Sequence, residues 1–168
     1  MKLLFAPWRA DYSKSSDNTK KENATTEDCI FCKHCTQDNN EHNKKHYILQ
    51  QTDKSIVLLN LYPYNAGHLL VLPKKHVATL DALSNKERAD LVELVSKYNK
   101  LLVNTLGAQG INVGMNLGKA AGAGIPSHLH IHLVPRWTGD TNFLATVGNT
   151  KTISFDLNEI YKKLKKSV

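Results

Sequence analysis

The chain has 168 residues, a hydrophobic content of 41% and a formal charge of +7, which favours one globular domain over a disordered chain. No apolar run approaches the roughly 18 residues that span a bilayer, and the run near the N-terminus is too short for a signal peptide. Four lysines lie in the last eight residues, so the charge does not indicate the continuous basic face that nucleic acid requires. We expect a cytoplasmic protein that binds neither membrane nor nucleic acid.

Three cysteines lie within the segment CIFCKHC, at positions 29, 32 and 35. An odd, closely packed set is a poor disulfide framework, and inside a cell it indicates metal binding or redox chemistry. The spacing Cys29-x-x-Cys32 is half of a tetrahedral zinc site. A redox motif would need a thioredoxin-like βαβ context, which is absent. His34 and Cys35 are additional donors, so the ligand set stays open. Buried cysteines without a metal are a further alternative. The polar flanks at 10–28 and 36–45 predict loops.

Beyond His46 the hydrophobic pattern becomes regular. Ser84 and Glu87 form a capping box ahead of apolar residues at helical spacing, and Gly107 follows as the helix end. Strands are predicted over 47–50, 55–61, 68–72, 110–116 and 127–134, with helices over 84–106 and 156–166 and a glycine-rich loop over 117–126. Pro73 and Pro135 are expected to end two of these strands. Hairpin-like strands around one long helix predict an α+β fold with a mostly antiparallel sheet. One domain over 1–168 would comprise an extension (1–45), a core (46–143) and a tail (144–168).

Three histidines alternate with aliphatic residues in the stretch SHLHIHLVPRW, which begins at Ser127. In a strand, His128, His130 and His132 share one face, while the aliphatic residues between them face the core. On a helix the same rings would not converge. The row is either a set of metal ligands or a nucleophile with neighbours that bind an oxyanion.

This row resembles the signature of the histidine triad (HIT) family of nucleotide-binding hydrolases and transferases. The segments LLNLYPYNAGHLLVLPKKH (58–76) and NVGMNLGKAAGAGIPSHLHIHLVPRWTGDTNF (112–143), with APWR near the N-terminus, are similar to the branch of the diadenosine polyphosphate hydrolases and phosphorylases. The resemblance implies cleavage of dinucleoside polyphosphates at the α-phosphate, through a covalent nucleotidyl-histidine, by a homodimer that associates through the 84–106 helix and the strand near Gly110.

The resemblance also assigns roles to individual residues. His130 would be the nucleophile, His132 would contact the phosphate and leaving oxygen, and His68 would support the row, in which His128 is the first member. The remaining nucleotide contacts would come from Asn60 at the ribose, Asn116 and the backbone of Gly122 and Gly124 at phosphate oxygens, Ser127 as the nearest hydroxyl for an incoming phosphate, and Trp137 at a base or phosphate. A core or dimer contact is an equally good interpretation of Trp137.

In many family members with an N-terminal Cys-x-x-Cys, two histidines complete the metal site, and they correspond to His76 and His128 here. A closed Cys29, Cys32, His76, His128 set would be structural and would hold the N-terminal segment against the core. The nucleotide acceptor stays open between water and inorganic phosphate. Nucleoside phosphoramidate cleavage is a competing activity, and a non-catalytic nucleotide-binding module is a competing function. The sequence defines neither the base preference nor any need for Mg²⁺ with the substrate.

Overall fold

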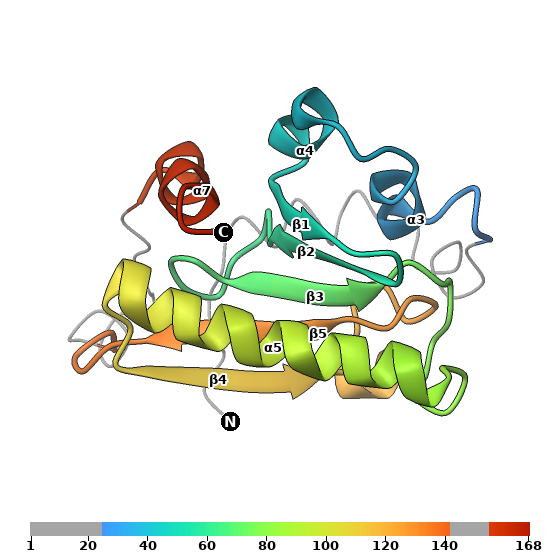
Figure 1. Cartoon of the computed structure of the whole chain (residues 1–168). Coiled ribbons are helices and arrows are strands. Elements are labelled where there is room, and N and C mark those ends of the chain that lie inside the picture. The colour runs from blue at the N-terminus through green and yellow to red at the C-terminus, as the bar shows by residue number, and fades with distance from the viewer. Residues whose placement is uncertain (1–24, 142–154) are drawn as a thin grey trace.

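Five antiparallel strands form one sheet in the order β1-β2-β3-β5-β4 in the computed structural model of the chain, which describes residues 25–141 and 155–168 (Figure 1). The strands are β1 (Ile48–Gln51), β2 (Ser55–Leu59), β3 (Leu69–Pro73), β4 (Gly110–Met115) and β5 (Ile131–Arg136). The helices are α3 (Ile30–His34), α4 (Asn40–Lys45), α5 (Asn85–Leu106) and α7 (Leu157–Lys165), with a 3₁₀ turn at Lys119–Ala121. The predicted α+β class is confirmed. The APWR motif, most of the 10–28 segment and the start of the tail lie outside the described residues.

The central strands are buried on both faces, which explains why they are apolar without alternation. In β2, Val57 belongs to the core under α5, while Ile56 and Leu58 belong to a second core against α3. Successive side chains of a strand point to opposite faces, so β2 and its neighbour β3, also fully buried, supply both cores. One face of the sheet therefore packs against α5. The other face is only partly covered, by α3.

The long helix α5 crosses one face of the sheet (Figure 1). The predicted capping box is present, because the Ser84 hydroxyl accepts from the Glu87 N–H and the Glu87 carboxylate accepts from the Ser84 N–H. Gly107 ends the helix in the left-handed conformation, with φ of 64°. Five of its side chains are buried at helical spacing, Leu91, Leu94, Tyr98, Leu101 and Leu102. Within the described residues no helix combines the length and the apolar character needed to cross a membrane.

The structure corrects the predicted loop at 36–45 and the predicted roles of two prolines. The 36–45 segment is not all loop: α4 forms there because the Asn39 side chain caps it by accepting from the His42 N–H. Pro73 lies within β3, and Pro135 lies within β5, paired with Ile111. β3 pairs with β5 only from 131 to 133, so the missing N–H of Pro135 falls where β5 has no strand partner on that side.

The strand of the histidine row begins at Ile131 rather than at Ser127. Before it, the His128 N–H donates to the Ile125 carbonyl and the Leu129 N–H donates to the Val77 carbonyl, so this segment is held by loops instead of a ladder. The predicted faces are nevertheless confirmed. Leu129, Ile131 and Leu133 all belong to the core under α5.

Gly67 immediately precedes His68 and occupies a position that only glycine fits well. Its φ is +70°, and a Cβ there would lie 2.5 Å from Cδ1 of Leu106. We expect Gly67→Ala to lower the free energy of unfolding by about 2–3 kcal/mol, because backbone strain adds to the smaller cost of displacing the end of the Leu106 side chain. Gly107→Ala is the matched control, since its φ is +64° with nothing within 4 Å of the added Cβ, and it should cost only about 1 kcal/mol. Equal losses in urea unfolding would contradict the steric part of this account.

Candidate functional site

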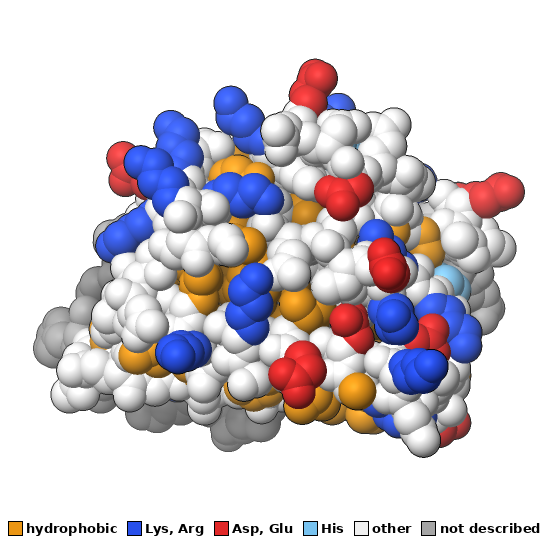
Figure 2. Space-filling view, viewed as in Figure 1, with side chains coloured by type: hydrophobic (Ala, Val, Ile, Leu, Met, Phe, Trp, Pro, Cys, Tyr) orange, Lys and Arg blue, Asp and Glu red, His pale blue; other side chains and the backbone are white. Residues whose placement is uncertain are grey.

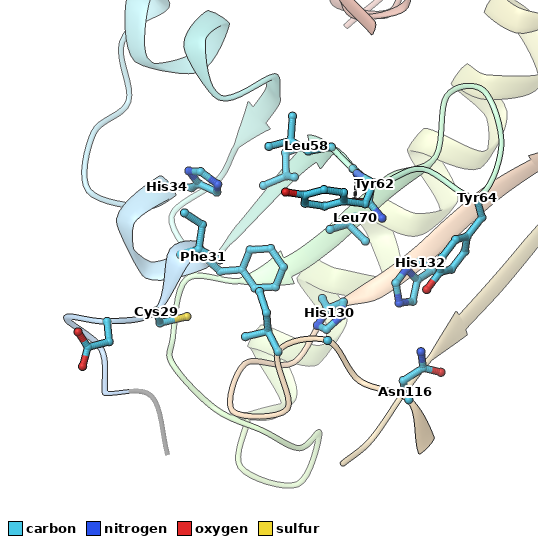
Figure 3. Close-up of a pocket in the computed structure, with 17 residues that line it drawn as sticks. Cys29, Phe31, His34, Leu58, Tyr62, Tyr64, Leu70, Asn116, His130 and His132 are labelled. Atoms are coloured by element: carbon cyan, nitrogen blue, oxygen red, sulfur yellow. Dashed lines mark hydrogen bonds between the residues drawn. The ribbon is translucent and has the colours of Figure 1, made fainter. Parts of the chain in front are cut away.

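A cavity of about 400 Å³ opens on the α3 side of the sheet (Figure 3). Its walls come from α3, β2, β3, β5, the turn after β2 and the glycine-rich loop. Figure 3 shows His130 between two groups of side chains: His132, Tyr64 and Asn116 on one side, and Phe31, Leu58, Tyr62 and His34 on the other. The cavity therefore has one end rich in histidine and amide groups and another that is mainly aromatic and aliphatic.

The tautomer of His130 follows from its backbone partner. Its Nδ1 lies 2.8 Å from the carbonyl oxygen of His128, and because a carbonyl only accepts, Nδ1 carries the proton. In the neutral ring Nε2 then has a free electron pair. Burial lowers the pKa of His130, so the neutral form dominates at pH 7. The ring of Phe31 packs against it with centroids 5.2 Å apart. The row thus presents one buried imidazole in the nucleophilic form.

A second chain of hydrogen bonds fixes the proton on His132. The Tyr64 N–H donates to Nδ1 of His68 over 3.0 Å, so the His68 proton lies on Nε2. That nitrogen is 2.9 Å from Nδ1 of His132 and donates to it. His132 when neutral therefore carries its proton on Nε2. The two rings at the cavity, with centroids 5.0 Å apart, are complementary: His130 offers an electron pair and His132 offers an N–H.

The structure brings most of the predicted nucleotide contacts to the cavity. Asn60, Asn116, Gly122 and Gly124 line it together with His130 and His132. The Asn60 side chain also turns inward, accepting from the Tyr62 N–H and lying 3.3 Å from Nδ1 of His68. His68 is fully buried behind His132.

The other two predicted contacts lie elsewhere. Ser127 and Trp137 are not among the described residues that line the cavity. The backbone N–H of Trp137 donates to Asp140, in the loop that follows β5. Arg136 also pairs with Asp140, over 2.6 Å, so its charge serves this loop rather than the cavity.

Four donors gather next to the row, at the start of α3. Cys29, Cys32, His76 and His128 place their ligand atoms within 4.8 Å of one another. Nε2 of His128 donates to the Pro73 carbonyl over 2.8 Å, which leaves its Nδ1 as a ligand atom, 3.4 Å from Sγ of Cys29. Sγ of Cys32 lies 3.2 Å from Nδ1 of His76. Zn–S and Zn–N bonds at a tetrahedral angle give S···N edges of about 3.6 Å, so this cluster could bind zinc.

Electrostatics also fit a cation in this cluster. Burial and the neighbouring Cys29 raise the pKa of the Cys32 thiol to about 12, so two adjacent thiolates need a positive charge to balance them. Burial lowers the pKa of His128 to about 4, which keeps its ring neutral and able to coordinate. Among the described residues, Cys35 and His34 are not part of the group. The four donors leave no position for a substrate, as in a structural site.

Helix α3 connects the cluster to the cavity. Its N-cap Cys29 and its Cys32 carry two of the four donors, while Ile30, Phe31 and His34 line the cavity. Sequence reasoning missed these three cavity residues, together with Asp28, Leu58, Leu61, Tyr62, Tyr64, Leu70 and Ile125. The sequence signal that could have found them is the apolar pair Ile30 and Phe31, which lies between the two cysteines. If the cysteines bind a metal, the side chains between them are held in fixed positions and can form the wall of a cavity.

Comparisons with known proteins agree with this architecture. The HIT domain model matches residues 41–139. An AP-4-A phosphorylase of Mycobacterium tuberculosis is 46% identical over 96 residues, which are 57% of this chain and 49% of that protein, so the match spans about half of the relative. A HIT-like protein of Methanocaldococcus jannaschii is 34% identical over 82% of this chain and 98% of its own length. A Zn-bound histidine triad family protein of Mycobacterium smegmatis superimposes with a TM-score of 0.68 at 25% identity, covering 85% of this chain and 94% of that one. The histidine row, the fold and these matches together show that the chain belongs to the HIT family.

Proposed function

We propose that the protein is an enzyme that cleaves dinucleoside polyphosphates, such as diadenosine tetraphosphate, at the α-phosphate through a covalent nucleotidyl-His130. The observation that carries the proposal is the hydrogen bond from Nδ1 of His130 to the His128 carbonyl, because it leaves a free electron pair on the Nε2 of a ring that lines the cavity. A neutral imidazole is a competent nucleophile near pH 7 without an added base.

In the first step Nε2 of His130 would attack the α-phosphorus, forming a P–N bond as the P–O bond to the polyphosphate leaving group breaks. The Nε2–H of His132, set by the His68 relay, would donate to the oxygen on which charge develops. Asn116 and the amides near Gly122 would hold the other phosphate oxygens. In the second step an acceptor oxygen attacks the same phosphorus, the P–N bond breaks, and His130 is regenerated.

Water and inorganic phosphate are the two candidate acceptors for the second step. The 46% identity to a protein named as a phosphorylase favours phosphate, although that match covers about half of the relative. The glycine-rich loop contains no serine or threonine to hold an incoming phosphate. Transfer of the nucleotide from His130 to phosphate instead of water is therefore the second form of the proposal.

Incubation with diadenosine tetraphosphate, with and without phosphate, separates these forms. Chromatography should show ATP and AMP if water is the acceptor, and ATP with phosphate-dependent ADP if phosphate is. Absence of any product under both conditions would contradict the proposal and favour a nucleotide-binding module. A parallel assay with adenosine phosphoramidate tests the phosphoramidate activity.

We also propose that a structural zinc ion occupies the Cys29, Cys32, His76 and His128 cluster. The fit of the donor distances and the neutral state of His128 support it. When bound, the ion would supply a cross-link between α3, the segment after β3 and the start of the row, with no part in the phosphoryl chemistry.

A homodimer is the third part of the proposal. β4 is an edge strand of the sheet, and Val113 on it is 51% exposed. On α5, Val92 and Val103 are 63% and 41% exposed, and Figure 2 shows hydrophobic side chains along the border where α5 and β4 lie. A partner would cover this edge and these side chains. Sedimentation should then give twice the chain mass of 18.8 kDa, and a single-chain mass would contradict the dimer.

A further inference from the structure

The aromatic end of the cavity contains a histidine that the proposed chemistry does not use. His34 lies there with Phe31, Leu58, Tyr62 and Leu70 (Figure 3). With the α-phosphate at His130, which is the placement that the proposed function requires, this end is where a nucleobase fits, because about 400 Å³ accommodates roughly one nucleotide. Aromatic and aliphatic walls suit the faces of a base and leave its polar edge to be satisfied.

One nitrogen of the His34 ring is enclosed by protein, which leaves the other nitrogen to contact a ligand. The residue is 6% exposed, and within the described part of the chain its Nδ1 is buried without a hydrogen-bond partner. In its neutral form the ring has one donor and one acceptor nitrogen.

The residues around His34 fix its position, and His34 is not one of the potential metal ligands within residues 25–141 and 155–168. His42 Nε2 bonds to the His34 carbonyl over 3.0 Å, and the His34 and His46 rings pack with centroids 4.6 Å apart. Among the described residues, His34 is outside the group of four potential metal ligands. The ring is thus a fixed polar element in an otherwise apolar part of the cavity wall.

We propose that His34 is a specificity-determining residue that hydrogen-bonds to a ring nitrogen of the substrate's purine base. A buried acceptor without a partner costs less than a buried N–H without one, so Nδ1 is the bare nitrogen and Nε2 carries the proton. The Nε2–H then donates to an acceptor nitrogen on the edge of the purine, while the base lies among Phe31, Leu58 and Tyr62.

Equilibrium binding to the full chain tests this without turnover, with AMP and ribose 5-phosphate as ligands in calorimetry. His34→Leu keeps the bulk and removes the donor, and it should weaken AMP about tenfold, the loss expected for one hydrogen bond. Ribose 5-phosphate, which has no base, should bind His34→Leu within about twofold of wild type. His34→Gln restores a donor and should keep AMP binding within about threefold of wild type.

His46→Leu is the matched control. It removes the ring that packs beside His34, and His46 is not among the described residues that line the cavity. It should leave AMP binding within about threefold of wild type. AMP binding by His34→Leu equal to that of wild type would overturn the inference, as would an equal loss for AMP and ribose 5-phosphate, or a wild type that binds AMP no better than ribose 5-phosphate. If binding depends on the base and on His34 but diadenosine tetraphosphate is not cleaved, the proposed function is wrong and the role of His34 in base binding still holds.

Discussion

Replacing His130 by alanine should lower kcat on diadenosine tetraphosphate by at least about 10³-fold, because the variant has no atom on which to carry the nucleotide. AMP binding should change by less than about threefold, since the phosphate contacts at Asn116 and His132 and the aromatic end of the cavity remain. Steady-state kinetics and calorimetry on the same preparation give the two numbers. The pattern expected is loss of kcat with retained affinity.

The control for this prediction is His46→Ala, which removes another imidazole, one that packs against His34 and not against the row. It should keep kcat within about threefold of wild type. Trapping adds a direct measurement: wild type denatured in alkali during turnover of labelled substrate should retain label, and His130→Ala should not. Activity of His130→Ala near the wild-type level, or label that persists in the variant, would show that the reaction does not use this nucleophile.

Removal of zinc should produce the largest loss of stability. A ligand present at about 1,000 times its Kd stabilises the folded state by about 4 kcal/mol, and for a chain of this size that corresponds to roughly 8–16 °C in Tm. We expect Cys32→Ala, or treatment of wild type with a chelator, to lower Tm by this amount and to remove one zinc per chain. Scanning calorimetry and elemental analysis are the measurements.

Cys35→Ala provides the matched control, because Cys35 lies three residues from Cys32 but outside the group of four donors among the described residues. It should retain one zinc and a Tm within about 2 °C of wild type. Loss of zinc in Cys35→Ala would mean that the ligand set is different. A wild type purified without zinc, whose Tm a chelator does not change, would contradict the structural role.

The histidine row shows what the sequence can predict and where it stops. The period of two in 128–133 correctly predicts which side chains face the core under α5, because burial of Leu129, Ile131 and Leu133 is a property of the pattern itself. It does not predict that the strand begins at Ile131. That boundary depends on the Leu129 N–H donating to Val77, a partner far away in the chain, and no local pattern carries this information.

The N-terminal segment illustrates a different limit. Helix α4 has the sequence NEHNKK, with no apolar periodicity, so only its Asn39 cap separates it from a loop. The Cys-x-x-Cys spacing predicts half of a metal site, whereas His76 and His128 follow from family resemblance. His34, a candidate ligand by sequence, belongs to the cavity wall instead, because a helix of five residues turns it away from the cysteines toward Ile30 and Phe31.

His128 contributes two groups that respond differently to mutation. Its imidazole belongs to the group of four potential metal ligands, while its carbonyl sets the tautomer of His130. Every amino acid has the same carbonyl, so no substitution at position 128 deletes the group that keeps the free electron pair of His130 on Nε2. Substitutions at position 128 would therefore change metal affinity and stability. Any variant whose loop still folds would keep the proton of His130 on Nδ1. The chemistry of the row is thereby protected by the backbone, the part of the protein that point mutation cannot remove.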